Sequence, residues 1–84
     1  MYLTGYCSYC QAALRLLEQK GVTDIEKIRV DLEPARRTEM TQRSGRYTVP
    51  QIWIGDRHVG GCDELDALER GGALDALLLE TERT

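Results

Sequence analysis

The chain has 84 residues, of which 42% are hydrophobic and 30% are charged, and its formal net charge is −3. This length predicts a single domain over residues 1–84, and the slight acidity disfavours nucleic acid as a partner. The apolar runs are far shorter than the ~20 residues that cross a bilayer, and no signal peptide is visible, so we expect no membrane partner. Three cysteines do not suit the disulfide framework of a small secreted protein, which favours reduced thiols and a cytoplasmic location.

Strand and helix patterns alternate along the chain. The expected elements are a strand over 1–6, a helix over 8–20 ended by Gly21, a strand over 25–32, a helix from Pro34 to Gly45, a hairpin over 49–61 and helical segments separated by Gly71-Gly72. In the second strand, Ile28, Val30 and Leu32 alternate. A strand–helix–strand crossover makes the first two strands parallel, and the hairpin adds antiparallel strands to the same sheet. The order therefore predicts an α/β fold with a mixed, four-stranded sheet covered by helices.

The motif "YCSYC" places two cysteines, Cys7 and Cys10, three residues apart at the start of the first helix. The free N–H groups of the first helical turn and the positive end of the helix dipole favour a thiolate at Cys7. Cys10 lies one turn further along the same face, close enough to form a disulfide with Cys7. The asymmetry predicts an exposed nucleophile at Cys7 and a more buried resolving thiol at Cys10.

Two other interpretations of the pair remain open at this point. The pair could be inert, or it could be half of a zinc site whose second half is His58 and Cys62 in "HVGGC". A structural zinc site usually has both halves on short knuckles, whereas Cys10 takes the core-facing position of a helix. Redox chemistry is therefore favoured.

The stretch "TVPQIWI" carries the second motif. Val49 precedes a proline and is pushed toward extended geometry, and Pro50 belongs at a strand start because it cannot donate to a sheet. If the Val49–Pro50 bond is cis, the backbone N–H and C=O of Val49 turn outward and can pair with an extended peptide. An ordinary trans proline at a strand edge is the alternative.

Together, the two motifs resemble those of the glutaredoxin family. "CSYC" resembles the family's C-P-Y-C active site, and residues 43–65 resemble its T-V-P-Q-I-F-I…G-G-x-D-D-L core. The trailing "LDALERGGALDALL" resembles the short bacterial form, so the resemblance covers nearly the whole chain. It implies a thioredoxin-like fold, a cis peptide bond at Pro50 and glutathione as substrate. Two positions depart from the family pattern, Ser8 in place of proline and Thr4 in place of a frequent lysine.

The residues and the resemblance together suggest how glutathione would bind. The free N–H groups of the helix after Gly60-Gly61 would bind the γ-glutamyl carboxylate, and Asp63 would take the ammonium group. Thr48 and Val49 would pair with the cysteinyl unit, Tyr9 would pack beside the peptide, and Arg37 would bind the glycine carboxylate. The expected glutathione contacts are Tyr9, Arg37, Thr48, Val49, Pro50, Gly61, Cys62 and Asp63.

The implied activity is glutathione-dependent reduction of protein–glutathione mixed disulfides and of protein disulfides, with ribonucleotide reductase as one candidate client. A rival function is the binding and delivery of a [2Fe–2S] cluster held in a dimer by two Cys7 thiolates and two glutathiones. A redoxin reduced by thioredoxin reductase ranks third, because that group lacks the "TVPQ…GGCD" groove. We expect a monomer unless a cluster is bound.

Overall fold

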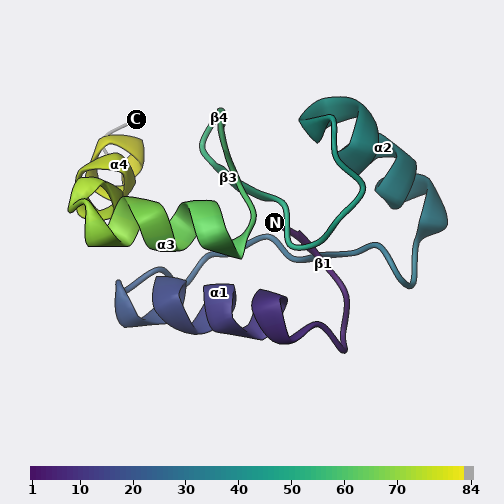
Figure 1. Cartoon of the computed structure of the whole chain (residues 1–84), viewed down its shortest axis with the longest axis horizontal. Coiled ribbons are helices and arrows are strands. Elements are labelled where there is room, and N and C mark those ends of the chain that lie inside the picture. The colour runs from purple at the N-terminus through teal and green to yellow at the C-terminus, as the bar shows by residue number, and fades with distance from the viewer. Residues whose placement is uncertain (83–84) are drawn as a thin grey trace.

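The computed structural model describes residues 1–82 and has its strands and helices in the expected order (Figure 1). The elements are β1 (Tyr2–Leu3), α1 (Ser8–Gln19), β2 (Ile28–Arg29), α2 (Pro34–Ser44), β3 (Ile52–Ile54), β4 (Arg57–Gly60), α3 (Cys62–Arg70) and α4 (Ala73–Glu82). Pro34 opens α2, where its missing N–H is not needed, and Gly45 ends that helix in the left-handed conformation with φ of 74°. No helix within the described residues is both long enough and apolar enough to span a bilayer.

The strands form two pairs that meet at one point. β1 and β2 are parallel, with Tyr2 opposite Ile28, and β3 and β4 are antiparallel, with Trp53 opposite His58. Tyr2 and Gln51 join the two pairs by exchanging backbone hydrogen bonds of 2.9 and 3.1 Å. The expected four strands are therefore present in the order β2-β1-β3-β4, but as two small sheets linked by a single bridge.

Side chains that alternate along the strands build two cores on opposite faces. Leu3, Ile52 and Ile54 pack on one face with the buried residues of α1, together with Leu65 of α3 and Leu74 of α4. Tyr2 points to the other face. There it packs with Ile28 and Val30, with Met40 from α2, and with the partly buried Trp53. Figure 1 shows the result, with α1 and α3 on one side of the strands and α2 on the other.

The second strand is shorter than expected, and the prediction that Leu32 alternates inward with Ile28 and Val30 is wrong. β2 ends at Arg29, after which Leu32 and Glu33 donate backbone hydrogen bonds to the Arg29 carbonyl at 3.2 and 3.1 Å. The chain therefore turns before Leu32, which is 68% exposed. Asp31 lies in the same turn, and a two-pronged contact with Arg29 (2.6 and 2.7 Å) holds it near the Gly5 N–H that precedes Cys7.

Candidate active site

Cys7 caps the first helix with its own sulfur. It is the N-cap residue of α1, in an extended backbone conformation, and its Sγ accepts a hydrogen bond from the Cys10 N–H at 3.2 Å. A sulfur in this position faces the free N–H groups of the first turn and the positive end of the helix. Cys7 is also half-buried rather than enclosed, so a disulfide can reach it from solvent.

Cys10 is the buried member of the pair. Its side chain is 0% exposed and packs in the core beneath α1. Burial first, and then a hydrogen bond with Cys7, raises the pKa of the Cys10 thiol to about 12. Cys10 is therefore a protonated, enclosed thiol at neutral pH, whereas Cys7 is half-buried at the helix start. The structure thus shows the predicted difference in burial between the two cysteines, while their roles as nucleophile and resolving thiol stay predictions.

The loop before β3 lies beside Cys7. The Val49–Pro50 bond is cis, which confirms the prediction from the sequence. The Cys7 sulfur, as a thiol, donates a weak hydrogen bond to the Val49 carbonyl oxygen at 3.9 Å. No residue within 1–82 accepts from the Val49 N–H, and Thr48 before it is exposed. A peptide docked in an extended conformation on Val49 would therefore lie next to the nucleophile.

The start of α3 packs against the same loop. Gly61 is the N-cap residue of α3, and a Cβ atom added there would lie 3.4 Å from the Pro50 carbonyl oxygen, so a side chain would crowd the loop. Cys62 follows, half-buried, and its pKa is raised by burial first and then by nearby charges that include Asp66 and Cys7. Asp63 is exposed in the first turn of the helix.

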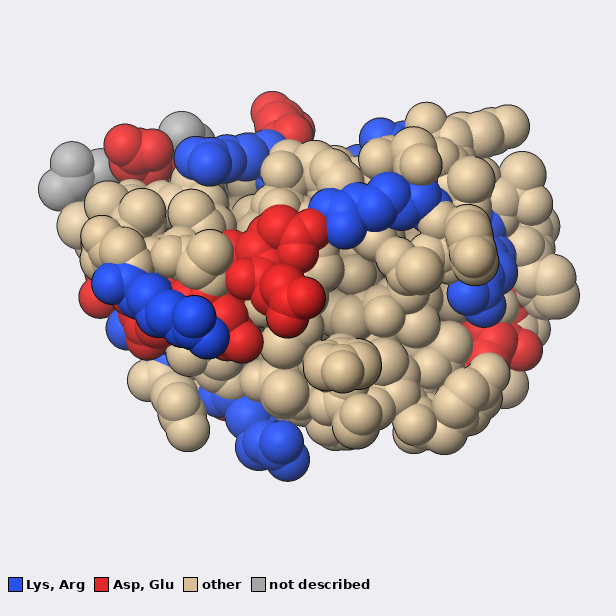
Figure 2. Space-filling view, in the orientation of Figure 1, with Lys and Arg blue, Asp and Glu red and all other residues tan. Residues whose placement is uncertain are grey.

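A charged pair lies at the start of α3. Figure 2 shows acidic side chains gathered where this helix begins, with a basic side chain against them. Glu64 forms an ion pair with Arg46, which comes from the loop after α2. The hydrogen bond from Arg46 lowers the pKa of the Glu64 carboxyl, and the backbone N–H groups of Gly61 and Glu64 lower it further. Some of the free N–H groups expected to bind an anion at this helix start thus already bind the Glu64 carboxylate.

Two further predicted residues border the site from other elements. Tyr9 lies in the first turn of α1 and is 65% exposed, so it is free to contact a bound peptide. Arg37 of α2 donates to the Tyr47 carbonyl oxygen at 2.8 Å, which brings its guanidinium to the segment that leads into Thr48. The structure therefore gathers Cys7, Cys10, Thr48 to Pro50 and the start of α3 into one region, with Tyr9 and Arg37 at its edge.

Sequence reasoning missed two residues behind the loop. Gln51 is fully buried and contacts Thr48. His58 is half-buried, and its Nε2 lies 2.8 Å from the Gln51 Oε1. The sequence did carry a signal for Gln51. It lies directly after Pro50 and before the apolar Ile52 and Ile54, where a strand residue is expected to be buried, and a buried polar side chain needs hydrogen-bond partners.

His58 and Cys62 do not form the second half of a zinc site with Cys7 and Cys10. His58 directs Nε2 to Gln51 and stacks against Trp53, with ring centroids 4.4 Å apart. In the part of the chain that the structure describes, no group of three or more His, Cys, Asp or Glu side chains is placed to hold a metal ion.

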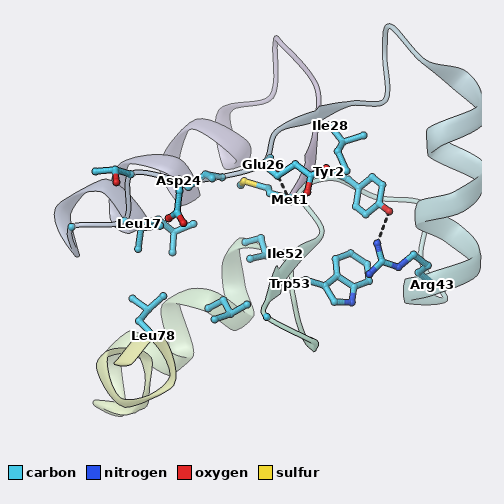
Figure 3. A pocket seen from close by; sticks show the side chains of 16 residues that line it. Met1, Tyr2, Leu17, Asp24, Glu26, Ile28, Arg43, Ile52, Trp53 and Leu78 are labelled. Carbon is cyan, nitrogen blue, oxygen red and sulfur yellow. Dashed lines mark hydrogen bonds between the residues drawn. The ribbon is translucent and has the colours of Figure 1, made fainter. Parts of the chain in front are cut away.

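A large cavity lies away from the cysteine pair. Its volume is about 670 Å³, and Leu17 of α1, Leu78 of α4, Trp53 and Arg43 are among the residues around it (Figure 3). None of the predicted site residues lines it. The candidate active site is therefore the surface region around Cys7, and the cavity lies in a different part of the molecule.

Comparison with known proteins agrees with the resemblance. The glutaredoxin family model matches residues 1–59. The chain is 55% identical to a glutaredoxin of Pseudomonas aeruginosa over 78 residues, which cover 93% of this chain and 92% of that protein. It is 49% identical to glutaredoxin 3 of Escherichia coli over 78 residues, with 93% of each chain covered.

Solved structures are similar over the same length. A buckwheat glutaredoxin–glutathione complex matches with a TM-score of 0.89 and 33% identity, covering 96% of this chain and 76% of that one. A glutaredoxin from Brucella melitensis matches with a TM-score of 0.80 and 51% identity, covering 92% and 83%. The similarity includes the thioredoxin-like arrangement of strands and helices.

Proposed function

The chain belongs to the glutaredoxin family and is a thiol–disulfide oxidoreductase, and we propose that it uses glutathione to reduce protein–glutathione mixed disulfides and protein disulfides. The observation that carries this proposal is the Cys7 sulfur, which accepts from the Cys10 N–H at 3.2 Å and lies 3.9 Å from the Val49 carbonyl oxygen. A nucleophile at a helix start is thus placed beside a backbone segment that can pair with a peptide.

In the glutathione route, the Cys7 thiolate attacks the glutathione sulfur of a protein–glutathione mixed disulfide. The bond between that sulfur and the protein sulfur breaks, the protein thiolate leaves and takes a proton from solvent, and a Cys7–glutathione disulfide remains. A second glutathione, as its thiolate, attacks the glutathione sulfur of this intermediate. Glutathione disulfide is released, and Cys7 returns as a thiolate.

In the dithiol route, Cys7 attacks one sulfur of a protein disulfide, and Cys10 then attacks the Cys7 sulfur. The client leaves as a dithiol and a Cys7–Cys10 disulfide forms. Because Cys10 is buried and its pKa is raised to about 12, it must lose its proton as it attacks. This requirement favours the glutathione route for mixed disulfides and reserves Cys10 for clients that hold two cysteines. Ribonucleotide reductase is one candidate client of this kind.

We propose that glutathione lies across the region between α1, the cis-proline loop and α3. The backbone N–H and C=O of Val49 pair with its cysteinyl unit, Thr48 and Pro50 shape the surface below, and Tyr9 packs beside it. The N–H groups of Cys62 and Asp63, after Gly61, receive the γ-glutamyl carboxylate, and the Asp63 carboxylate takes the ammonium. Arg37 binds the glycine carboxylate. The complex of the buckwheat relative with glutathione supports the choice of ligand.

The division of roles is tested with two variants in a glutathione-coupled assay on a glutathionylated peptide. Cys7→Ser removes the nucleophile and is expected to abolish turnover. Cys10→Ser leaves the glutathione route intact and is expected to keep deglutathionylation while losing reduction of protein disulfides. Equal losses in both variants would contradict the assigned roles.

The rival function, a [2Fe–2S] cluster, has less support. Within residues 1–82 no protein-only metal site is assembled, so each chain would offer Cys7 alone, with glutathione thiols and a second chain completing the set. We therefore propose a monomer in the cytoplasm that acts on disulfides. An absorption spectrum of protein purified anaerobically with glutathione decides between them: a brown dimer would favour the cluster, and a colourless monomer the redox enzyme.

A further inference from the structure

We propose that His58 is a positioning residue for the glutathione-binding loop and that it acts through the buried side chain of Gln51. The inference rests on the proposed function, because it assumes that Thr48 and Val49 present the backbone on which glutathione docks. His58 lies in β4, Gln51 is the residue directly before β3, and Thr48 lies in the loop beside Cys7. The three side chains thus connect the hairpin to the site.

Gln51 is the central member of this connection. It is 0% exposed, and its Nε2 donates to the Thr48 carbonyl oxygen at 3.0 Å and contacts the Thr48 hydroxyl at 3.3 Å. Its Oε1 lies 2.8 Å from the His58 Nε2. Every polar atom of the Gln51 side chain therefore has a partner, as burial requires.

The partners determine which atom donates. The Thr48 carbonyl oxygen can only accept, so the amide nitrogen of Gln51 must face it and the amide oxygen must face His58. His58 is consequently the donor of that bond, with a proton on Nε2. Without a donor at this place, the buried Oε1 would lose its partner, which costs free energy and weakens the restraint on Gln51.

An aromatic stack holds the imidazole in place. His58 lies against Trp53, and Arg43 of α2 covers the Trp53 ring, with its guanidinium carbon 4.5 Å from the ring centroid. Arg43 also donates to the Tyr2 hydroxyl at 2.8 Å, and the Tyr2 ring meets Trp53 edge-on (Figure 3). The orientation of His58 is therefore set by packing that does not involve the site.

The connection has a direct consequence for the loop. The Thr48 carbonyl is occupied from inside by Gln51, whereas no residue within 1–82 accepts from the Val49 N–H, which remains available to a ligand. Holding Thr48 fixes the residue that leads into Val49. A preorganised backbone costs less to order on binding, so loss of the connection should weaken docking and leave the chemistry at Cys7 unaltered.

Two His58 variants separate the hydrogen bond from the packing. His58→Phe keeps a flat ring against Trp53 but has no donor, and His58→Gln supplies an N–H donor near the place of Nε2 but no ring. In the glutathione-coupled assay, we expect His58→Phe to raise the KM for a glutathionylated peptide roughly fivefold, the effect of one lost hydrogen bond, with kcat nearly unchanged. His58→Gln should restore most of the wild-type KM.

Further variants and a measurement without turnover complete the test. Gln51→Met should raise KM like His58→Phe, and Arg57→Ala, an exposed neighbour in β4, should have no effect. Nitrogen-15 spectra of the wild-type imidazole should show the proton on Nε2. An unchanged KM in His58→Phe, equal KM increases in both His58 variants, or a neutral imidazole with the proton on Nδ1 would overturn the inference alone. Absence of turnover in the wild-type protein would overturn the proposed function as well.

Discussion

The Sγ atom of Cys7 accepts a hydrogen bond from the Cys10 backbone nitrogen at 3.2 Å, so the nucleophile is also the cap of its own helix. One atom thus serves both the fold and the chemistry. The first turn of α1 gains a partner for one of its free N–H groups, and the sulfur gains a donor that fixes its position at the helix start. Different substitutions at Cys7 should therefore change stability by different amounts even where they abolish activity equally.

We expect Cys7→Ser and Cys7→Ala to be equally inactive but unequally stable. A serine hydroxyl can take over the cap, whereas alanine leaves the N–H without a partner and should lower the free energy of unfolding by about 1 kcal/mol. Urea unfolding followed by circular dichroism measures the difference. Ser8→Ala, at the exposed first residue of α1, is the matched control. Equal stability of the Cys7 variants would show that the sulfur does not stabilise the helix.

The three thiols should react with an alkylating reagent in a fixed order. Cys7 is accessible and faces the helix start, so it should be modified first at pH 7.5. Cys62 should follow slowly because burial and nearby carboxylates raise its pKa. Cys10, with its pKa raised to about 12 and no exposed surface, should stay unmodified in the folded protein. Mass spectrometry of peptides after timed reaction with iodoacetamide measures the order, and early modification of Cys10 would contradict it.

The sequence predicted those features that short-range physics determines. The helix start at Ser8, the Pro34 and Gly45 boundaries of α2, and the break at Gly71-Gly72 follow from local conformational preferences, and all were confirmed. The cis bond at Pro50 was expected from the family resemblance, since the residues alone left a trans bond open. The positions of Cys7 and Cys10 followed from placing the motif at a strand–helix junction.

The errors and omissions arose from contacts between distant residues. The alternation from Ile28 to Leu32 fits a strand, but the turn after Arg29 exposes Leu32. The contact between His58 and Gln51 was missed because the two side chains meet only once the hairpin has formed. Glu64 and Arg46 are 18 residues apart and form their ion pair at the start of α3, which no local pattern reveals.

Arg37 gives a test of the expected contact with the glycine carboxylate of glutathione. Its guanidinium donates to the Tyr47 carbonyl oxygen beside Thr48, so it lies close to the loop while keeping other donors free. Arg37→Ala should raise the KM for a glutathionylated peptide roughly threefold to tenfold, as loss of one charge-assisted contact does, with little change in kcat. Arg15→Ala on the exposed face of α1 is the control. A KM that stays at the wild-type value would remove Arg37 from the binding site.

Thr4 should be a place where the fold can be stabilised. The residue is only 2% exposed, and its hydroxyl oxygen has no hydrogen-bond partner within the described chain. Thr4→Val keeps the shape of the side chain and removes a polar atom that loses water on folding, so we expect the free energy of unfolding to rise by about 1 kcal/mol. Denaturant unfolding measures it, and Thr38→Val, on the exposed surface of α2, controls for the exchange of hydroxyl for methyl. Destabilisation by Thr4→Val would mean that the hydroxyl has a partner, such as a buried water.

His58 should make stability fall in mildly acidic solution. Burial first, then the positive charge of Arg46, lowers the pKa of the imidazole from its ordinary value of 6.5; Arg43 adds to this effect and Glu64 opposes it. Because folded His58 takes up a proton less readily than unfolded His58, its contribution to stability is complete above pH 6.5 and is lost as the pH falls through the lower pKa of the folded state. The carboxylates whose pKa is lowered act in a more acidic range.

Comparing wild type with His58→Phe isolates this effect, since the variant keeps the other titrating groups, including the N-terminal amine. The free energy of unfolding of the two proteins, measured in urea between pH 5 and pH 8, should differ by a constant amount above pH 7. Below that, the wild-type value should fall more steeply than that of the variant. Parallel curves over the whole range would show that the hairpin environment does not disfavour the charged imidazole. In that case neither the burial of His58 nor the positive charges of Arg46 and Arg43 would act on the ring enough to alter stability.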